Sequence, residues 1–411
     1  MMTCIFQQRG IAAGLLAGAL ALAGGAAAHI AHAGSNPATT SGPAMKTPMP
    51  GMSMGATPTP GAGGSMSGMG STATGAAARA YNVVFARALP YTVLVTEMGM
   101  ADMNAMVPGK TDAMMAMQKN SGVRTLFGPL LHTGSMPHGV NVTADGRYAL
   151  VSNFMDDPGT AVQVDLRSMK IVRRFTVGIN PTHFVFTPDR RYAFVTDFGS
   201  GDVYRLDLSN GSNGATRRIA FPGDNCLRAH GDTLAPDGRT MYVACAGEAW
   251  IYTLDTRTLR PGRVGIADPG AYDVKVNVRR HELWVSNQTA NTVSVLDEGT
   301  LKKLVTVSLG RNMGPSLLDL TPDGRRAYVG DLTGNAVSVI DTASRKVIKT
   351  IPVAAQPFGP TITPDGRYVY EPSIKGSAVT VIRVSDNRVM AVVPAPVGAL
   401  HVAIAPRVLG G

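Results

Sequence analysis

The 411-residue chain contains only 3 cysteines and 2 tryptophans, and charged residues make up only 16 % of it. Three cysteines are too few for a small, disulfide-dense scaffold. Helix-forming composition is also weak, because the chain carries 47 glycines and 27 prolines, which are poor residues in helix interiors. A long-helix or coiled-coil protein is therefore excluded, and the length fits two or three ordinary domains or one large β architecture.

The sequence also lacks the common catalytic and cofactor motifs. It has no H-E-x-x-H pair, no phosphate-binding loop, and no carboxylates spaced for acid/base work. Covalent c-type haem is excluded because no C-x-x-C-H is present. The formal net charge is +10, but the basic residues are scattered without a stripe of interleaved aromatics. We therefore expect no nucleic-acid partner, and an anionic surface, a polysaccharide or an acidic protein fits better.

The N-terminus has the pattern of a secretory signal. An uncharged run at 11–28 follows Arg9 and leads to an A-x-A motif at 31–33, so we expect cleavage of residues 1–33. The alternative is an uncleaved anchor, for which this Ala/Gly-rich run is marginal. Cleavage predicts a periplasmic or secreted bacterial protein with no transmembrane segment. Residues 34–78 are rich in Gly, Ser, Pro and Met with a single charge, Lys46, which predicts a disordered linker.

The remainder, residues 79–411, is a repeat. Similar segments of the type TPDGRYAFVTD begin at steps of 44, 48, 42, 44 and 42 residues, at Thr143, Thr187, Ala235, Asn277, Thr321 and Thr363. A period in the forties with alternating strands is typical of propeller blades. Asp-Gly pairs in four of the units predict tight turns that need a positive φ.

A further unit, less regular, begins near Thr92, with strands expected at 92–97, 113–118 and 123–127. The chain is therefore predicted to be all-β, a seven-bladed propeller of four-stranded blades. For closure of the ring we favour 401–404 as the inner strand of the first blade, because this joins the chain ends and removes open edges. The segment 82–85 is the alternative inner strand.

The segment PHGVNVTADGRYALVSN at 137–153 and its looser copies resemble the YVTN-type β-propeller repeat of secreted and surface-layer proteins. They are also similar to the haem-carrying propeller of cytochrome-type nitrite reductases. The resemblance implies the fold more sharply than an activity, since propellers host hydrolases, haem sites, copper sites and binding modules.

Four histidines are expected to meet on one face of the disk. His138, His183, His230 and, if the ring closes as favoured, His401 lie near the starts of first strands. Because these starts surround the central channel, the four side chains are candidate ligands for a metal or haem. The alternative is that they only hydrogen-bond between blades.

Methionines concentrate near the same face. Of the 21 methionines, 15 lie between Met45 and Met155. With His132, the candidate metal ligands are Met98, Met100, Met103, Met106, Met136 and Met155. Thioethers are soft ligands that select Cu(I), which favours copper. The alternatives are an adaptable, Met-rich interaction surface and simple packing.

Cys226 and Cys245 are the two cysteines that remain after cleavage. Both are expected at the histidine-bearing face of one blade, and an oxidising compartment favours a disulfide between them. A thiolate ligand near His230 is the alternative.

The leading hypothesis is a non-catalytic, monomeric binding module that handles copper or a redox partner at its Met/His face, with a periplasmic or surface protein as partner. A haem- or metal-dependent oxidoreductase, or a haem-handling protein, is the first alternative. A surface scaffold for proteins or glycans is the second.

Overall fold

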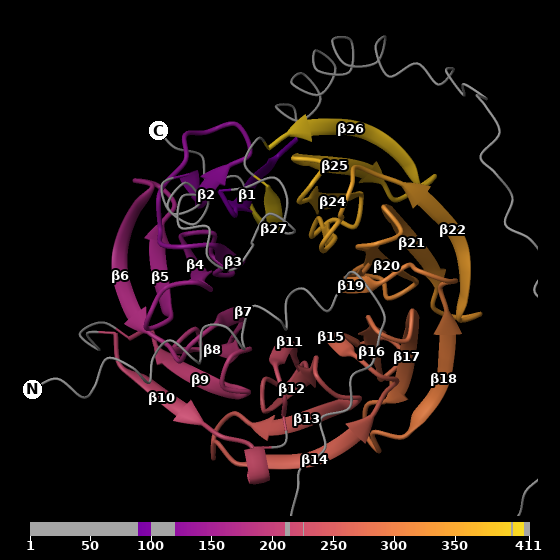
Figure 1. Cartoon of the computed structure of the whole chain (residues 1–411), viewed down its shortest axis with the longest axis horizontal. Helices are drawn as coiled ribbons and strands as arrows, with labels where there is room; N and C mark the ends of the chain where they lie inside the picture. Colours follow the sequence, from indigo (N-terminus) through magenta and orange to yellow (C-terminus); the bar gives the residue numbers. More distant parts are fainter. Residues whose placement is uncertain (1–88, 100–119, 210–213, 225, 396–397, 407–411) are drawn as a thin grey trace, which may run out of the picture.

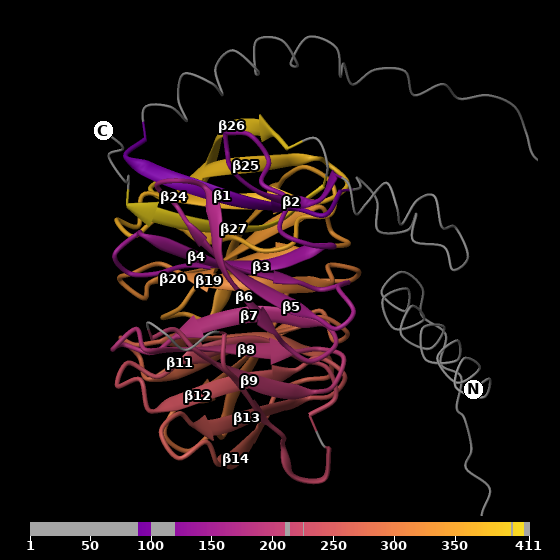
Figure 2. The same cartoon turned by 90° about the vertical axis from the view of Figure 1, so that its left-hand side faces the viewer.

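The computed structural model describes residues 89–99, 120–209, 214–224, 226–395 and 398–406. In these residues, 27 strands form seven antiparallel sheets around a central axis (Figure 1). Figure 2 shows the ring edge-on, with the strands running between its two faces. The prediction of an all-β, seven-bladed propeller is confirmed. The predicted signal peptide and linker lie outside the described residues, and within them no helix has the length and apolarity to cross a membrane.

The blades are numbered here in chain order. Blade 1 consists of β27 (Ala399–Pro406), β1 (Tyr91–Glu97) and β2 (Gly122–Thr125). Blades 2 and 3 consist of β3 (Pro137–Val142), β4 (Tyr148–Asn153), β5 (Thr160–Asp165), β6 (Lys170–Thr176), β7 (Pro181–Phe186), β8 (Tyr192–Asp197), β9 (Asp202–Asp207) and β10 (Thr216–Ile219). Blades 4 and 5 consist of β11 (Ala229–Leu234), β12 (Thr240–Cys245), β13 (Trp250–Asp255), β14 (Pro261–Ile266), β15 (Ala271–Asn277), β16 (Glu282–Asn287), β17 (Thr292–Asp297) and β18 (Lys303–Ser308). Blades 6 and 7 consist of β19 (Pro315–Leu320), β20 (Arg326–Asp331), β21 (Ala336–Asp341), β22 (Lys346–Pro352), β23 (Thr361–Ile362), β24 (Tyr368–Ser373), β25 (Ala378–Arg383) and β26 (Arg388–Pro394).

The core lies between blades rather than within one central mass. Alternating residues of each strand face opposite neighbours, so every middle strand is buried on both sides. Between blades 2 and 3, for example, Leu150 and Phe175 pack against Phe184 and Val195. This stacking places the first strand of every blade at the channel and leaves only the outermost strands half exposed.

The turn between the first two strands of a blade follows directly from the T-x-D-G sequence. Thr143 Oγ1 donates to Asp145 Oδ1 at 2.6 Å, Asp145 Oδ1 accepts from Arg147 N at 3.0 Å, and Gly146 takes a φ of 67°. The predicted positive φ is confirmed at the glycine of all four Asp-Gly pairs, Gly146, Gly238, Gly324 and Gly366. These turns lie at the end of the disk opposite to the first-strand starts.

Blade 1 closes the ring as favoured from the sequence. Strand β27 pairs with β1 along its length and contacts β3 of blade 2, so the last described strand is innermost. The prediction for 123–127 is wrong in one respect: β2 pairs directly with β1 and is the third strand of its blade, not the fourth. The predicted strand at 113–118 and the segment 82–85 lie outside the described residues.

Candidate metal centre

Shifts of strand register in the first strands orient the histidine side chains toward the channel. His138 and His230 are the second residues of β3 and β11, whereas His183 and His401 are the third residues of β7 and β27. In each blade a shift of strand register occurs close to the histidine. Such irregularities re-aim side chains, which explains why residues one position apart in the repeat meet.

Three of the four histidines form a compact group. His138, His183 and His230 each offer one ring nitrogen, and these three atoms lie within 4.8 Å of one another. The ring centroids are 4.7 to 5.3 Å apart, and the residues are only 5, 7 and 1 % exposed. Among the described residues this is the one group of three or more potential histidine, cysteine or carboxylate ligands.

The hydrogen bonds of the group leave ligand atoms free. His230 Nδ1 lies 3.1 Å from the carbonyl oxygen of Tyr272, so this nitrogen is the N–H donor and Nε2 keeps its lone pair. Within the described residues no hydrogen-bond partner is present for His138 Nδ1, His183 Nε2 or His230 Nε2, although all three atoms are buried. Buried imidazole nitrogens without partners are unusual in proteins, and their lone pairs can accept an ion or a water.

His401 is held differently. Its Nδ1 accepts a hydrogen bond from Val140 N at 3.2 Å, which makes Nε2 the protonated nitrogen. Its ring lies 5.1 Å from that of His183, yet it is not part of the group of three. In this tautomer Nε2 of His401 carries a proton, so the ring has no free lone pair to offer to the group.

Burial sets the charge of the group. It lowers the pKa of His138 and His183 well below the usual value, that of His230 to about 3 and that of His401 to about 4. Mutual repulsion among the imidazoles lowers the pKa values of His138 and His183 further. The four rings are therefore neutral at pH 7, which is the state that binds metal.

The surroundings are apolar. Met98, Met136, Tyr272 and Phe358 belong to one buried cluster at this end of the channel. The Tyr272 ring lies 3.9 Å from that of His230, and the Phe358 ring 5.5 Å from that of His138. Such a shell keeps water away and strengthens electrostatic and coordinate interactions inside it.

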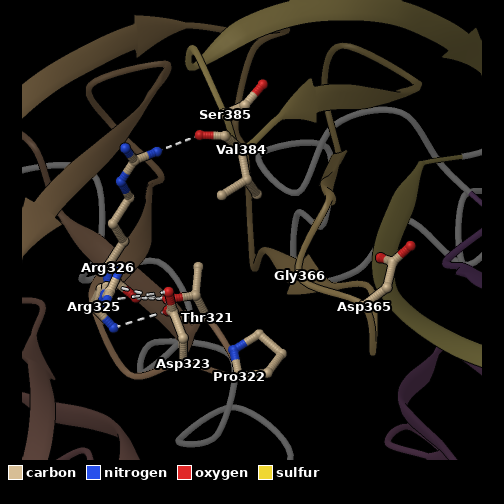
Figure 3. Close-up of a pocket in the computed structure, with 9 residues that line it drawn as sticks. All are labelled: Thr321, Pro322, Asp323, Arg325, Arg326, Asp365, Gly366, Val384 and Ser385. Carbon is tan, nitrogen blue, oxygen red and sulfur yellow. Dashed lines mark hydrogen bonds and ion pairs between the residues drawn. The ribbon is translucent and has the colours of Figure 1, made fainter.

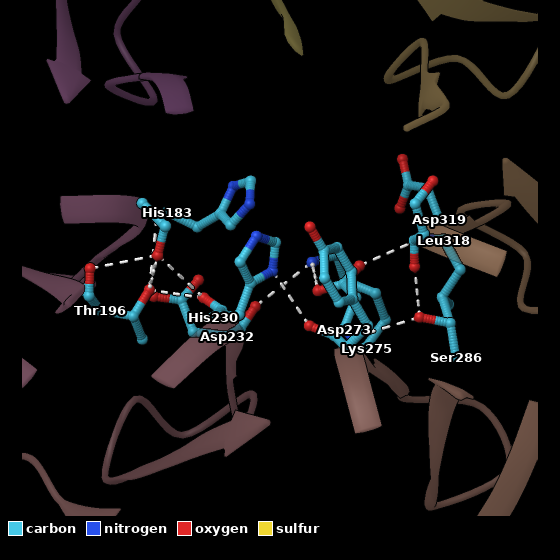
Figure 4. Close-up of polar contacts among 12 residues, drawn as sticks. His183, Thr196, His230, Asp232, Asp273, Lys275, Ser286, Leu318 and Asp319 are labelled. Atoms are coloured by element: carbon cyan, nitrogen blue, oxygen red, sulfur yellow. Dashed lines mark hydrogen bonds and ion pairs between the residues drawn. The ribbon is translucent and has the colours of Figure 1, made fainter. Parts of the chain in front are cut away.

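A buried charged network lies beside the histidines (Figure 4). Lys275 Nζ donates to Asp273 Oδ1 at 3.0 Å and to the carbonyl oxygen of Asp232 at 3.3 Å, and Asp273 Oδ2 accepts from Leu318 N at 3.1 Å. Burial raises the pKa of Asp232 to about 8 and that of Asp319 to about 6. Sequence reasoning missed these residues, although charged side chains inside otherwise apolar inner strands were a usable signal.

The other predicted ligands divide into three groups. Met98 and Met136 are buried in the cluster around the histidines, and Met155 packs against it while partly exposed. His132 is exposed, and its Nδ1 bonds the carbonyl oxygen of Ser121 at 2.8 Å, so the structure does not bring it into the group of three. The remaining methionines, Met100, Met103 and Met106, lie outside the described residues.

Cys226 and Cys245 are joined in a disulfide with a Cα–Cα distance of 5.1 Å. The bond lies in the core of blade 4, where both residues pack with Ala229, the neighbour of His230 in β11. The sulfurs are therefore occupied with each other and do not supply a thiolate.

A polar pocket lies at the opposite end of the disk (Figure 3). Its volume is about 350 Å³, and it is lined by turn residues of blades 6 and 7, including Asp323, Arg325 and Gly366. Arg325 is 69 % exposed and lies 3.8 Å from Asp323. Because its charged groups are solvated and paired with each other, this pocket is a weaker candidate than the histidine group.

Comparison with known proteins agrees with the fold. The sequence pattern of the YNCE-like β-propeller family matches residues 228–365. Comparison with curated protein sequences gives no match.

Three solved structures illustrate the range of similar proteins. A chain of Kuenenia stuttgartiensis hydrazine synthase is 20 % identical, covers 66 % of this chain and 96 % of its own, and has a TM-score of 0.58. The periplasmic gluconolactonase PpgL of Pseudomonas aeruginosa is 17 % identical, covers 77 % of this chain and 99 % of its own, and has a TM-score of 0.60. Virginiamycin B lyase of Staphylococcus aureus is 14 % identical, covers 62 % of this chain and 82 % of its own, and has a TM-score of 0.52.

At these identities the likeness concerns the fold alone, and the activities named are of unrelated kinds. The predicted resemblance to propeller repeat proteins is confirmed. The chain is a seven-bladed β-propeller whose residues 228–365 carry the YNCE-like sequence pattern.

Proposed function

We propose that the protein is an extracytoplasmic binding module that holds one copper ion on His138, His183 and His230. The observation that carries this proposal is that each of these three buried imidazoles brings one ring nitrogen within 4.8 Å of the other two. Each ring also has a buried nitrogen for which the described residues supply no hydrogen-bond partner. Imidazole is a good ligand for copper and zinc. The carbonyl of Tyr272 fixes the tautomer of His230, as hydrogen bonds to the second ring nitrogen do in metal sites.

The chemistry of the shell favours Cu(I) over a divalent ion. The ligand group contains only neutral histidines, and the ring of apolar side chains around it includes the thioethers of Met98 and Met136. A bound ion keeps its full charge in such a site, so the smaller charge costs less. The Lys275 ammonium lowers the pKa of His183 and His230, and the same repulsion penalises a second positive charge.

A single ion fits the dimensions better than haem. The imidazole centroids are only 4.7 to 5.3 Å apart, and the Phe358 and Tyr272 rings pack directly against them. Haem bound by one of these histidines needs an open, flat space on one side of its ring. The rings in contact with each histidine occupy that space.

An oxidising, extracytoplasmic location is supported by two observations. The Cys226–Cys245 disulfide is of a kind that persists outside the cytoplasm. The run at 11–28 and the A-x-A motif at 31–33 have the pattern of a cleaved secretory signal.

The test is a titration of the protein with Cu(I) under anaerobic conditions against a chromophoric chelator. We expect one ion per chain. His183→Ala should lower the affinity about a hundredfold, which is the largest loss usually found when a residue that supports a metal ligand is changed. His281→Ala is the matched control, because His281 is 82 % exposed and lies in a turn far from the group. Equal affinity in the two variants would disprove the site, and tighter binding of Zn²⁺ than of Cu(I) would reassign the metal.

A further inference from the structure

The outer rim of blade 4 carries an apolar surface. Its outermost strand, β14, presents Val264 and Ile266, which are 42 and 62 % exposed, and Ile266 is the most exposed large hydrophobic side chain of the described residues (Figure 1). Trp250 and Tyr252 of β13 lie directly opposite Ile266 and Val264, respectively. Cross-strand partners project to the same side of a sheet. These four side chains therefore form one surface, the blade 4 patch.

The patch has an aromatic base at the boundary with blade 3. The Tyr252 ring lies 4.7 Å from the Phe221 ring and 6.2 Å from the Trp250 ring. Tyr252 and Phe221 are buried in the core cluster between blades 3 and 4, and Trp250 packs against this cluster while partly exposed. Aromatic side chains held in this way are typical anchors for a partner protein, because little conformational freedom is lost on binding.

The repeat itself does not require an apolar surface at this place. The pair Trp250–Ile266 joins the first residue of the third strand to the last residue of the fourth. In four other blades the equivalent pair is small or polar: Thr160–Thr176, Thr292–Ser308, Ala336–Pro352 and Ala378–Pro394. Since those blades form without large apolar side chains here, the fold does not explain the ones in blade 4. A contiguous exposed apolar patch marks an interaction site.

Strand β14 also offers backbone groups for hydrogen bonding. It pairs with β13 alone, so its outer edge is unpaired within the described structure. Edge strands are usually protected by charged side chains. The only charged residue of β14 is Arg263, and its Nη1 donates to the carbonyl oxygen of Gly299 in blade 5. The guanidinium is therefore directed toward the next blade, and an extended segment can add to the edge as a further strand.

The charge of the rim indicates the kind of partner. The outermost described strand of every blade carries lysine or arginine, and none of these strands carries aspartate or glutamate. On the blade 3 side, Arg217 of β10 lies directly opposite Arg205 of β9, an arrangement of like charges that is unfavourable by itself. Arg205 is paired with Phe194, a residue of the cluster between blades 3 and 4, so both guanidinium groups are on the side of blade 4.

These charges favour an acidic partner over a second copy of this chain. Two copies that met rim to rim would bring cationic strands together, which is unfavourable, whereas carboxylates on a partner complement the rim. An anionic membrane offers the same charge, but it has no backbone groups that could pair with the edge of β14.

We propose that the blade 4 patch binds an extended acidic segment of a partner protein, which adds to β14 as a fifth strand. Aliphatic side chains of the segment pack on Trp250 and Ile266, and its carboxylates face Arg217 and Arg205. The patch lies on the outer rim, whereas the histidine group lies at the central channel, so this proposal does not depend on copper binding.

The test uses the purified full chain and a peptide of about ten residues in which glutamate alternates with valine or isoleucine. Titration calorimetry should show saturable binding. Bound peptide should also shift the tryptophan emission to shorter wavelength and protect it from quenching by acrylamide. The chain has 2 tryptophans, and Trp284 is fully buried, so these changes report Trp250.

Two substitutions remove the patch without introducing residues foreign to the repeat. Ile266→Ser and Val264→Thr copy Ser308 and Thr306, which occupy the equivalent positions of blade 5. The double variant should bind the peptide at least about tenfold more weakly. The matched control is Leu304→Thr, which changes a 46 % exposed aliphatic side chain on β18 and should leave the affinity unchanged.

Two further measurements test the chemistry of the partner. A peptide with lysine in place of glutamate should not bind, and binding of the acidic peptide should weaken as the salt concentration rises. The proposal is overturned if the acidic peptide does not bind, or if the double variant binds it as tightly as Leu304→Thr does. Binding to phosphatidylglycerol vesicles but not to the peptide would also overturn it and would assign the patch to a membrane. Copper titration of the same samples should give the same result in every variant, so the two proposals are tested separately.

Discussion

The two buried polar regions of this propeller lie in different parts of the ring and have opposite chemistry. The histidine group brings together imidazole nitrogens from the first strands of blades 2 to 4 and contains no carboxylate. Glu371 lies in the second strand of blade 7, on the face that packs against blade 6, and is a buried acid whose pKa is raised by burial and by Asp331. Because every blade presents the same positions to its neighbours, a few substitutions in the repeat are enough to give one side of the ring buried bases and the other side buried acids.

The largest expected effect is on the pH dependence of stability. The pKa values of the four histidines are lowered in the folded chain. Below a pH of about 6.5 the unfolded chain therefore binds more protons than the folded chain. The free energy of unfolding then falls by about 1.4 kcal/mol per pH unit for each histidine. The folded-state pKa values of Glu371 and Asp331 are raised, so their contribution is lost as the pH rises from about 4 toward 7.

Urea unfolding between pH 4.5 and 8 separates the two contributions. Glu371→Gln should reduce the loss toward neutral pH to the part contributed by Asp331 and should leave the histidine-dependent loss at low pH unchanged. An unchanged profile in Glu371→Gln would show that the carboxyl is charged in both states.

The next effect is the loss of copper. The variant with alanine at His138, His183 and His230 should lose at least about a hundredfold in Cu(I) affinity, while its near-ultraviolet circular dichroism stays the same. A loss of the near-ultraviolet signal together with the affinity would mean that the fold is damaged, and an unchanged affinity would contradict the site.

The disulfide gives a smaller effect that is confined to stability. Replacing Cys226 and Cys245 with serine should lower the free energy of unfolding by about 3 kcal/mol, from the entropy of a loop of 19 residues. The copper stoichiometry should remain one, because the sulfurs are not ligands. If the serine variant bound only half as much copper per chain, the cysteines would again be candidate copper ligands.

The smallest effect concerns His401. The variant His401→Gln removes the acceptor for Val140 N and should cost about 1 kcal/mol of stability. Because His401 is a donor beside the group rather than a member of it, copper still binds with a stoichiometry of one. A loss of affinity as large as that of His183→Ala would make His401 a fourth ligand.

The fold was predictable because the repeat is regular. The T-x-D-G turns, the period and the closing strand at 401–404 follow from spacing and alternation alone. The convergence of four histidines on one face also followed from the repeat. The separation of His401 from the group of three did not follow, because it depends on register shifts at Pro137 and Pro181 and on which nitrogen of His401 meets Val140.

The contacts of the other buried polar residues did not follow from the sequence, for physical reasons. Lys275 and its aspartates occupy inner-strand positions that only the closed ring brings together. Glu371 lies in the apparently ordinary strand YVYEPS, and its burial opposite Gly330 is visible only in the folded ring. The order of strands in blade 1 was predicted wrongly because the residues at 123–127 do not themselves show which strand they pair with.

Ring closure by β27 has a consequence for when the protein becomes functional. The strand pairs with β1 across a separation of about three hundred residues, and it carries His401 to Val140 beside the histidine group. Formation of contacts this distant in sequence is slow, and the group is enclosed only after the last strand is in place. A chain whose last strand has not yet been synthesised therefore has no enclosed histidine group, and under the proposed function tight copper binding would report that the complete ring has formed.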